Sequence, residues 1–155
     1  MKQGFVKVAA ASYAVAVADV RENTRVILET IHKMAAEGAK VMVLPELALT
    51  GYTCSDLFWQ SQMIDAAKEG LKEIADGTKG TDALIFVGLP WEQGGKLFNV
   101  AAVLCHGELL GVVPKKYLPN YNEFYELRHF TPGREAVTTT EFFGKEVPFG
   151  MYLLF

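Results

Sequence analysis

The chain has 155 residues, half of them hydrophobic and 21% charged, which is typical of one globular domain and not of a disordered or fibrous chain. A net charge of −3, with acidic and basic residues interspersed, gives no reason to expect binding to nucleic acid or to an anionic membrane surface. No segment approaches the ~18 apolar residues that a membrane span needs, and the opening residues lack the features of a signal peptide.

The first elements alternate between strand and helix. We predict a buried strand over Phe5–Tyr13 and a second over Lys40–Leu44, a nearly all-apolar run of the kind found in parallel strands covered on both faces. Between them, Asp19–Gly38 is predicted to be a helix, opened by a capping-box-like Asp19 and Glu22 and closed by a glycine suited to a left-handed exit. Its predicted buried face repeats at three- and four-residue spacing: Val20, Thr24, Ile27, Leu28, Ile31, Met34 and Ala35.

The second half of the chain adds one helix and then hairpins. Ser61–Gly77 is the second predicted helix, followed by a buried strand over Ala83–Leu89. A Gly-Gly turn leads into a strand over Phe98–Cys105, and another strand follows over Leu109–Val113. One face of the second helix carries Met63, Ala67, Leu71, Ile74 and Ala75.

This order of elements, β-α-β-α-β followed by antiparallel hairpins, predicts an α/β layered fold. A mixed sheet with helices on one face leaves its other face in need of a partner, which a similar half further along the chain would supply. Met151–Phe155 has the composition of a strand interior, whereas natural chain ends are more often polar. We therefore expect the chain to be a truncated piece of a longer protein.

Leu44–Tyr52 (LPELALTGY) is the first segment with the marks of a functional site. Glu46 follows the carboxyl end of a buried strand, which is where open α/β sheets place their ligand sites. Pro45 and the apolar residues after Glu46 predict partial desolvation of its carboxylate, which suits a general base. The alternative is that Glu46 only caps a turn or pairs with a nearby base.

Pro114–Glu126 (PKKYLPNYNEFYE) is the second such segment. It also begins where a strand ends, and it holds three tyrosines and a phenylalanine within nine residues, a density typical of a pocket or an interface. The alternative is that the aromatic residues are core and the two lysines ordinary surface residues. We favour that alternative for Lys116 but not for Lys115.

These segments together resemble a known family. PELALTGY, the SDLF that follows it and PKKYLPNYNEFYE, in this order and separation, are similar to the glutaminase domain of the glutamine-dependent NAD synthetases, within the nitrilase superfamily. The likeness extends over GLPWEQGGKLFNVAAVL and FFGKEVPFG, and so over nearly the whole chain. The resemblance implies a four-layer α-β-β-α sandwich, of which residues 1–155 are the N-terminal portion.

The resemblance also implies two members of a Glu-Lys-Cys triad. Glu46 matches the general base, and Lys115 matches the lysine, because Lys115-Lys116-Tyr117-Leu118 fits the pattern Lys, any residue, His or Tyr, Leu. The chemistry agrees with this assignment. A thiol needs a carboxylate to accept its proton, and a fixed ammonium stabilises the oxyanion that forms from the amide oxygen.

Further residues are assigned by the same resemblance. Tyr52 and Tyr121 are expected to shape a glutamine pocket, with Phe124 and Glu126 as further substrate-binding residues. Glu126 is a candidate to hold the α-ammonium of glutamine. Glu123 is expected to support the triad.

The triad cysteine is expected in a segment similar to E-x-C-E-D-x-W, which these 155 residues do not contain. Cys54 lies just after Tyr52 and Cys105 lies in an apolar strand, and neither matches the nucleophile motif. They also lack metal-ligand spacing, so no metal site is expected. A reducing, cytoplasmic setting fits best, with a single disulfide left open.

The resemblance implies a function for the longer protein, whereas the piece itself is expected to be inactive. Glutamine would form a γ-glutamyl thioester and release ammonia to a C-terminal synthetase domain, which would use ATP and Mg²⁺ to make NAD from nicotinic acid adenine dinucleotide. The amidase part would need no cofactor. Association into homo-oligomers is also implied.

Three other functions are less consistent with the sequence. A free-standing nitrilase-like amidase or carbamoylase is disfavoured by the SDLF and NYNEFYE stretches. A non-catalytic interaction module is disfavoured by the abrupt apolar end of the chain, since an uncovered sheet invites aggregation. A doubly wound nucleotide-binding domain lacks its G-x-G-x-x-G or P-loop motif.

Overall fold

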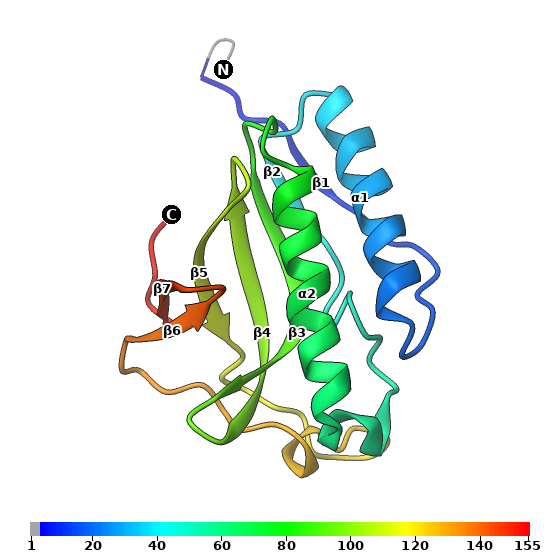
Figure 1. The fold of residues 1–155 in the computed structure, drawn as a ribbon, viewed down its shortest axis with the longest axis vertical. Helices are drawn as coiled ribbons and strands as arrows, with labels where there is room; N and C mark the ends of the chain where they lie inside the picture. Colours follow the sequence, from blue (N-terminus) through cyan, green and yellow to red (C-terminus); the bar gives the residue numbers. More distant parts are fainter. Residues whose placement is uncertain (1–3) are drawn as a thin grey trace.

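The computed structural model describes residues 4–155, so the first three residues of the expected domain lie outside the described part. One mixed seven-stranded sheet has the strand order β1-β2-β3-β4-β5-β7-β6 (Figure 1). The strands are β1 (Val8–Ala10), β2 (Val41–Val43), β3 (Leu84–Gln93), β4 (Lys96–Cys105), β5 (Glu108–Pro114), β6 (Thr138–Phe142) and β7 (Lys145–Phe149). The helices are α1 (Val20–Ala36) and α2 (Ser61–Gly77), with short 3₁₀ turns η1 (Ser55–Trp59) and η2 (Glu126–Arg128).

Strand directions follow the connections between them. The strands β1, β2 and β3 are parallel because a helix links each to the next, and β3, β4 and β5 form an antiparallel meander. The predicted order β-α-β-α-β followed by hairpins is therefore confirmed, as is the α/β fold class. Since β4 runs against both of its neighbours, β2, β3 and β5 point the same way, and their carboxyl ends lie at one edge of the sheet.

Both helices begin and end where local chemistry predicts. The Asp19 side chain accepts a hydrogen bond from the backbone N–H of Glu22 at 3.0 Å, which caps α1 at its first turn. Gly38, with φ of +84°, provides the left-handed exit. All five predicted core positions of α2 are buried, whereas in α1 Leu28 and Ala35 are only partly buried.

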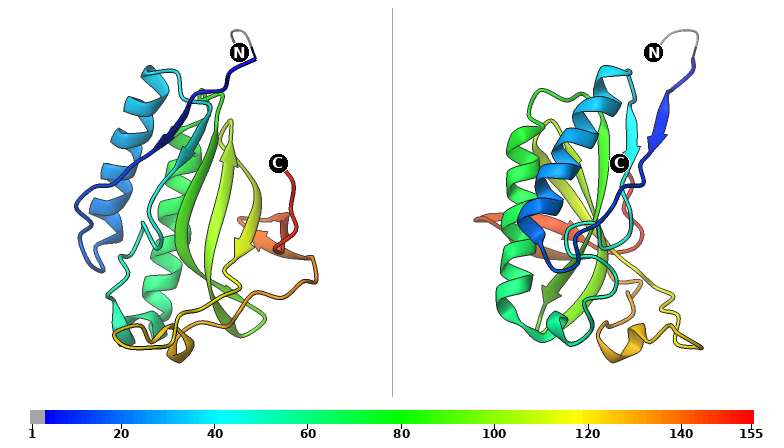
Figure 2. Two further views of the ribbon diagram at one scale, coloured as in Figure 1. Left: turned by 180° about the vertical axis from the view of Figure 1, so that it is seen from behind. Right: turned by 90° about the vertical axis from the view of Figure 1, so that its right-hand side faces the viewer.

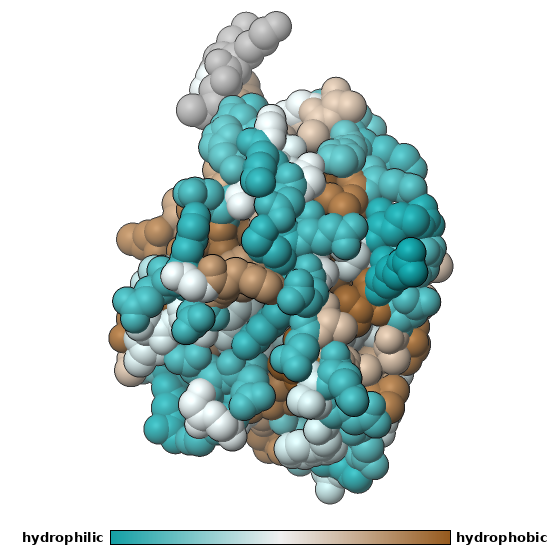
Figure 3. Space-filling view, viewed as in Figure 1, coloured by the Kyte–Doolittle hydropathy of each residue, from teal (hydrophilic) through white to brown (hydrophobic). Residues whose placement is uncertain are grey.

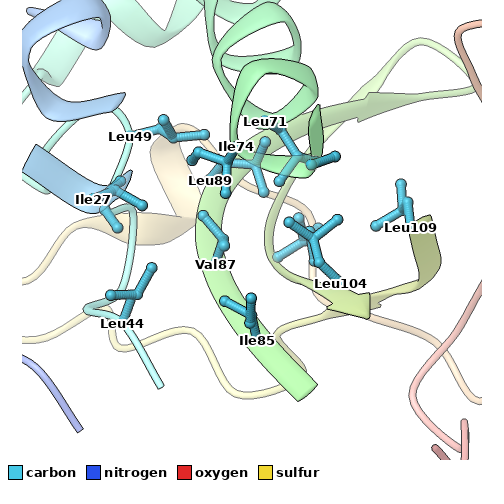
Figure 4. Packing of buried hydrophobic residues seen from close by; sticks show 14 of the residues in the cluster. Ile27, Leu44, Leu49, Leu71, Ile74, Ile85, Val87, Leu89, Leu104 and Leu109 are labelled. Carbon is cyan, nitrogen blue, oxygen red and sulfur yellow. The ribbon is translucent and has the colours of Figure 1, made fainter. Parts of the chain in front are cut away.

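The main hydrophobic core lies between the two helices and one face of the sheet (Figures 2 and 4). Ile27 of α1 and Leu71 and Ile74 of α2 pack over Val87 and Leu104 of the sheet, and all five are fully buried. The outer side of the helical layer is mostly hydrophilic (Figure 3). Within residues 4–155, no helix has the length and apolarity to cross a membrane.

The opposite face of the sheet is not covered by helices, as the right-hand view of Figure 2 shows. Val43 points to this side and is 45% exposed. A hollow of about 600 Å³ runs along this face between β2 and β5, and it is lined mainly by apolar residues. The strand β2 is thus covered on one face only, and not on both faces as the apolar run Lys40–Leu44 predicts. We refer to this surface as the open face.

Two sequence predictions about the strands are wrong. The first strand is three residues long, not nine, and Val8 within it is 68% exposed because β1 is an edge strand with no helix over its outer side. Met151–Phe155 is not a strand: it turns across the sheet, where the ring of Phe155 packs edge-on against Phe86 at 6.4 Å.

The hairpin of β6 and β7 was not predicted. Its two-residue turn, Phe143-Gly144, has positive φ at both positions, which is the geometry of a tight hairpin turn. The hairpin joins the sheet through a single parallel pairing of Val112 in β5 with Phe149 in β7.

Candidate active site

Glu46 lies in a tight turn that leaves β2. The backbone N–H of Leu44 donates to the carbonyl of Phe86, so the chain stays paired with β3 until just before Pro45. Leu47 then adopts a left-handed conformation, with φ of +49°, and its carbonyl accepts from Thr50 and Gly51. A non-glycine residue in this conformation stores strain, which is common beside functional groups. The turn directs the Glu46 side chain to the open face.

Gly88 of β3 makes this turn possible. A β-carbon at Gly88 would lie 2.5 Å from the backbone nitrogen of Leu47 and 2.6 Å from the carbonyl oxygen of Pro45. Only a residue without a side chain lets the backbone around Glu46 approach the sheet this closely.

Lys115 follows the carboxyl end of β5, two strands beyond β3. Its backbone N–H donates to the carbonyl of Asn99 in β4 at 2.8 Å, and its own carbonyl accepts from Gly133 at 2.8 Å. These bonds fix the base of the loop between Lys115 and Gly133. The Lys115 ammonium reaches across the sheet edge to Oε1 of Glu46 at 2.7 Å.

Glu126 is the second carboxylate on Lys115. Its oxygens lie 2.9 and 3.1 Å from the Lys115 Nζ, and Oε1 also accepts from the hydroxyl of Tyr52 at 2.9 Å. The residue is only 4% exposed, because η2 folds the loop back so that Glu126 lies beneath its surface. A buried carboxylate needs such partners to remain charged.

The exposure of the two carboxylates differs. The Glu46 side chain is 42% exposed and so only partly desolvated, whereas Glu126 is 4% exposed. The reason is that Glu46 faces the open face rather than the helical core.

Burial and charge act in opposite directions on Lys115. Burial is the largest single effect and lowers its pKa, but hydrogen bonds and charge interactions with Glu46 and Glu126 together outweigh it, so the pKa is raised above its ordinary value. Lys115 is therefore an ammonium at neutral pH. In Tyr52, by contrast, burial raises the pKa, and the hydrogen bond to Glu126 raises it further. The Tyr52 hydroxyl therefore stays protonated and remains a hydrogen-bond donor.

The expected pocket residues lie beside these charges. Tyr52 contacts Phe124 edge-on at 6.3 Å between ring centroids, and Phe124 contacts Tyr121 in the same way at 5.6 Å. Tyr121 is 63% exposed, so its ring forms the outer wall of the group. The structure thus brings Tyr52, Phe124 and Tyr121 together at the sheet edge that carries Glu46 and Lys115.

Glu123 is exposed and lines a hollow of about 240 Å³ together with Tyr52, Glu126 and His129. Among residues 4–155 the Lys115 ammonium pairs with Glu126 and not with Glu123, so the supporting role expected of Glu123 stays a prediction. Lys116 pairs with Glu135 at 3.4 Å on the surface, as the interpretation of an ordinary surface lysine predicts.

Asn99 was missed by the sequence reasoning. Its side-chain nitrogen donates to Oε1 of Glu46 at 2.5 Å, and the residue is 3% exposed. The feature of the sequence that indicates its role is a lone asparagine within the apolar run LFNVAAVL. A buried amide requires hydrogen-bond partners, so such a residue is expected to contact another polar group.

Neither cysteine is placed as a nucleophile. Cys54 is 3% exposed and its thiol donates to the carbonyl of Thr50 at 3.0 Å. Burial raises its pKa, which disfavours the thiolate. Cys105 lies at the far end of β4, six residues beyond Asn99, and both cysteines are free. No three His, Cys, Asp or Glu side chains in the described chain are grouped to hold a metal ion.

Comparison with protein families places this geometry among known proteins. The model of the carbon-nitrogen hydrolase family matches residues 7–151. Curated relatives include the glutamine-dependent NAD(+) synthetase of Mycobacterium tuberculosis, 36% identical over 154 residues, and that of Aquifex aeolicus, 36% identical over 121 residues. The alignments cover 99% and 78% of this chain but only 23% and 21% of those proteins. The chain therefore spans about a quarter of the length of these relatives.

Solved structures give the same picture. A glutamine-dependent NAD(+) synthetase from Cytophaga hutchinsonii superimposes with a TM-score of 0.88 at 31% identity, covering 94% of this chain and 25% of that one. An amidase from Nesterenkonia sp. superimposes with a TM-score of 0.71 at 23% identity, over 92% of this chain and 54% of the amidase. The second match shows the fold alone. The resemblance predicted from the sequence motifs is confirmed, and with it the nitrilase-like fold.

Proposed function

The chain belongs to the carbon-nitrogen hydrolase family, and from this premise we propose that it supplies the general base and the oxyanion-stabilising cation of a glutamine amidase. One observation carries the proposal. The Lys115 ammonium lies between Glu46 and Glu126, at the edge where β2 and β5 end. A base that accepts the thiol proton and a fixed cation that stabilises the oxyanion are groups that amide hydrolysis by a thiol requires.

Glu46 acts as the general base. Its Oε1 is held by Lys115 and Asn99, while the carboxylate remains 42% exposed toward the open face. The nucleophilic thiol comes from residues outside these 155, since Cys54 is bonded to backbone and Cys105 lies away from the site. The thiol proton passes to Glu46, and the sulfur attacks the amide carbon of glutamine.

Lys115 stabilises the oxyanion. An ammonium has three N–H donors: one points to Glu46 and one is shared by the two oxygens of Glu126, which leaves the third for the amide oxygen as it becomes negative. Glu126, itself held by Tyr52, keeps the ammonium in place. When the C–N bond breaks, the nitrogen takes the proton from Glu46 and leaves as ammonia. Water then gives a proton to Glu46 and attacks the thioester, the C–S bond breaks to release glutamate, and the proton passes from Glu46 to the thiolate.

Substrate recognition is assigned to Tyr52, Tyr121 and Phe124, whose rings form one connected group beside Lys115. Glu123 lines the adjoining hollow, and its carboxylate is proposed to bind the α-ammonium of glutamine there. Both oxygens of Glu126 already contact the Lys115 ammonium, which favours a supporting role for Glu126. Glu123 is therefore the residue proposed to bind the α-ammonium of glutamine.

The protein as a whole is proposed to pass ammonia to a synthetase domain that makes NAD from nicotinic acid adenine dinucleotide. The support is the name and length of the relatives, which are about four times as long as this chain. ATP and Mg²⁺ are assigned to that domain, and the amidase chemistry is proposed to need no cofactor. We also propose homo-oligomeric assembly and a cytoplasmic location, the latter supported by the two free cysteines.

The test is a substrate comparison in the whole protein that contains this chain. Glutamate and ammonia should form in equal amounts from glutamine, with little turnover of asparagine, simple aliphatic amides or N-carbamoyl amino acids. Intact mass during turnover should show the added γ-glutamyl group on the protein. Preference for a carbamoyl compound or a simple amide would instead support a free-standing amidase or carbamoylase.

A further inference from the structure

Asn99 occupies the position in the sheet that connects the two charged residues of the site. The strand order places β4 between β3, on which the Glu46 turn rests, and β5, which ends at Lys115. Because β4 runs antiparallel to both neighbours, its early residues lie at the edge where β3 and β5 end. Asn99 is the fourth residue of β4 and is 3% exposed.

Asn99 contacts both charged residues, each by a different part of the residue. Its side-chain nitrogen donates to Oε1 of Glu46 at 2.5 Å, and its backbone carbonyl accepts the N–H of Lys115 at 2.8 Å. The Lys115 ammonium donates to the same Oε1 of Glu46 at 2.7 Å. The Oε1 atom of Glu46 therefore receives two donors, whereas no side chain in the described residues donates to its Oε2 atom.

The amide is suited to this place for a chemical reason. Asparagine presents an NH₂ group to the carboxylate, without adding a charge that would compete with Lys115. A carboxylate held only by a flexible lysine can rotate and offer both oxygens to the ammonium. A second donor from the rigid sheet prevents that rotation.

We propose that Asn99 is a positioning residue: it fixes Glu46 through Oε1, so that Oε2 is the oxygen that receives the thiol proton. The inference rests on the amidase function proposed above. In the step concerned, the S–H bond breaks, its electron pair stays on sulfur, and the proton forms an O–H bond with Oε2. The same proton later leaves with the amine nitrogen. Asn99 itself does not touch the substrate.

The experiment measures kcat and KM for glutamine in the whole protein that contains this chain. Asn99→Leu removes the donor, and Asn99→Ser is a smaller change for use if the leucine variant does not fold. Circular dichroism checks that each variant is folded. Gln93→Leu is the matched control, because it removes a partly buried amide at the end of the neighbouring strand β3 that donates to the carbonyl of Thr139 and not to Glu46 or Lys115.

We expect Asn99→Leu and Asn99→Ser to lower kcat by about 10-fold or more, part of the 10²–10⁴-fold that a positioned base supplies. KM should change by less than about 3-fold, since the substrate contacts remain. Gln93→Leu should match the unsubstituted protein.

The outcomes separate the two proposals. An unsubstituted protein that does not hydrolyse glutamine overturns the amidase function. An active protein whose folded Asn99 variants keep the original kcat overturns the inference about Asn99. A decrease in kcat accompanied by an equally large rise in KM also overturns it, because Asn99 would then support the whole site and not the position of Glu46 alone.

Discussion

The ammonium nitrogen of Lys115 lies 2.7 Å from Oε1 of Glu46, although 69 positions separate the two residues along the chain. The sheet brings them together: β2 and β5 run in the same direction, and each of the two residues follows the end of its strand. Neither helix contributes to this contact. The active-site geometry therefore depends on the alignment of β2 through β5, and changes in that alignment should appear in activity.

Glu126→Gln should lower both the pKa of Lys115 and the rate of glutamine hydrolysis. The substitution removes a charge and a hydrogen bond that raise the pKa of Lys115, while the burial that lowers it remains. Misplacement of the ammonium should reduce kcat by about 10²-fold. The pKa can be followed by NMR of the Lys115 ε-methylene group. An unchanged Lys115 titration in a folded variant would contradict the assigned contact.

The unsubstituted chain should lose stability at high pH because of the same ion pairs. Since the pKa of Lys115 is raised in the folded state, its contribution to stability is fully present below its ordinary value of 10.5 and is lost as the pH rises through the folded value. Urea unfolding at pH values above 10.5 should show this loss, whereas between pH 7 and pH 9 the contribution should stay constant. In Lys115→Met the corresponding part of the pH dependence should be absent.

Gly88→Ala should destabilise the fold and impair the site together. The new β-carbon would collide with the backbone on either side of Glu46. We expect a loss of about 1–3 kcal/mol in the free energy of unfolding, as for other overpacked positions. Gly80→Ala is the matched control, because a β-carbon there meets nothing within 4 Å, and its effect should stay within about 0.5 kcal/mol. Equal effects of the two substitutions would count against the close approach.

The two thiols should differ in reactivity toward iodoacetamide. Cys54 is 3% exposed, and burial raises its pKa, whereas Cys105 is partly exposed. The native chain should therefore be alkylated at Cys105 first, and Cys105→Ser should react slowly until denatured. Rapid alkylation of Cys54 in the folded chain would revive it as a candidate nucleophile.

The 155-residue chain alone should associate through the open face. Val43 is 45% exposed there, beside an apolar hollow of about 600 Å³. Light scattering at micromolar concentration should detect oligomers or larger aggregates. Val43→Glu should reduce this association, and Val17→Glu, at a similarly exposed valine outside the sheet, should not. A monomer of the unsubstituted chain would contradict the prediction.

The sequence predicted the helices and the positions of Glu46 and Lys115 because these depend on local patterns. Amphipathic spacing and the Asp19 cap define α1, and the end of an apolar strand marks each charged residue. The resemblance supplied the functional assignment of both. The short edge strand β1 was overestimated because apolar composition does not show which strand lies at an edge.

The contacts of Asn99 and Glu126 could not be predicted in the same way. The Asn99 side chain reaches across 53 positions to Glu46, and this pairing depends on strand register. Glu126 reaches Lys115 only because the loop folds back, which neither residue's neighbours reveal. Glu123 and Glu126 lie in the same acidic, aromatic segment, where spacing alone does not show that Glu126 is buried and Glu123 exposed.

The most direct test is glutamate release by this 155-residue chain beside a chain extended through the next cysteine. We predict release by the longer chain only. Glu46→Gln should reduce it by about 10²–10⁴-fold, as for loss of a general base, and Lys115→Ala by about 10²–10³-fold, as for loss of an oxyanion donor. Activity in the 155-residue chain itself, or full activity of the longer chain without Glu46 or Lys115, would contradict the assigned roles.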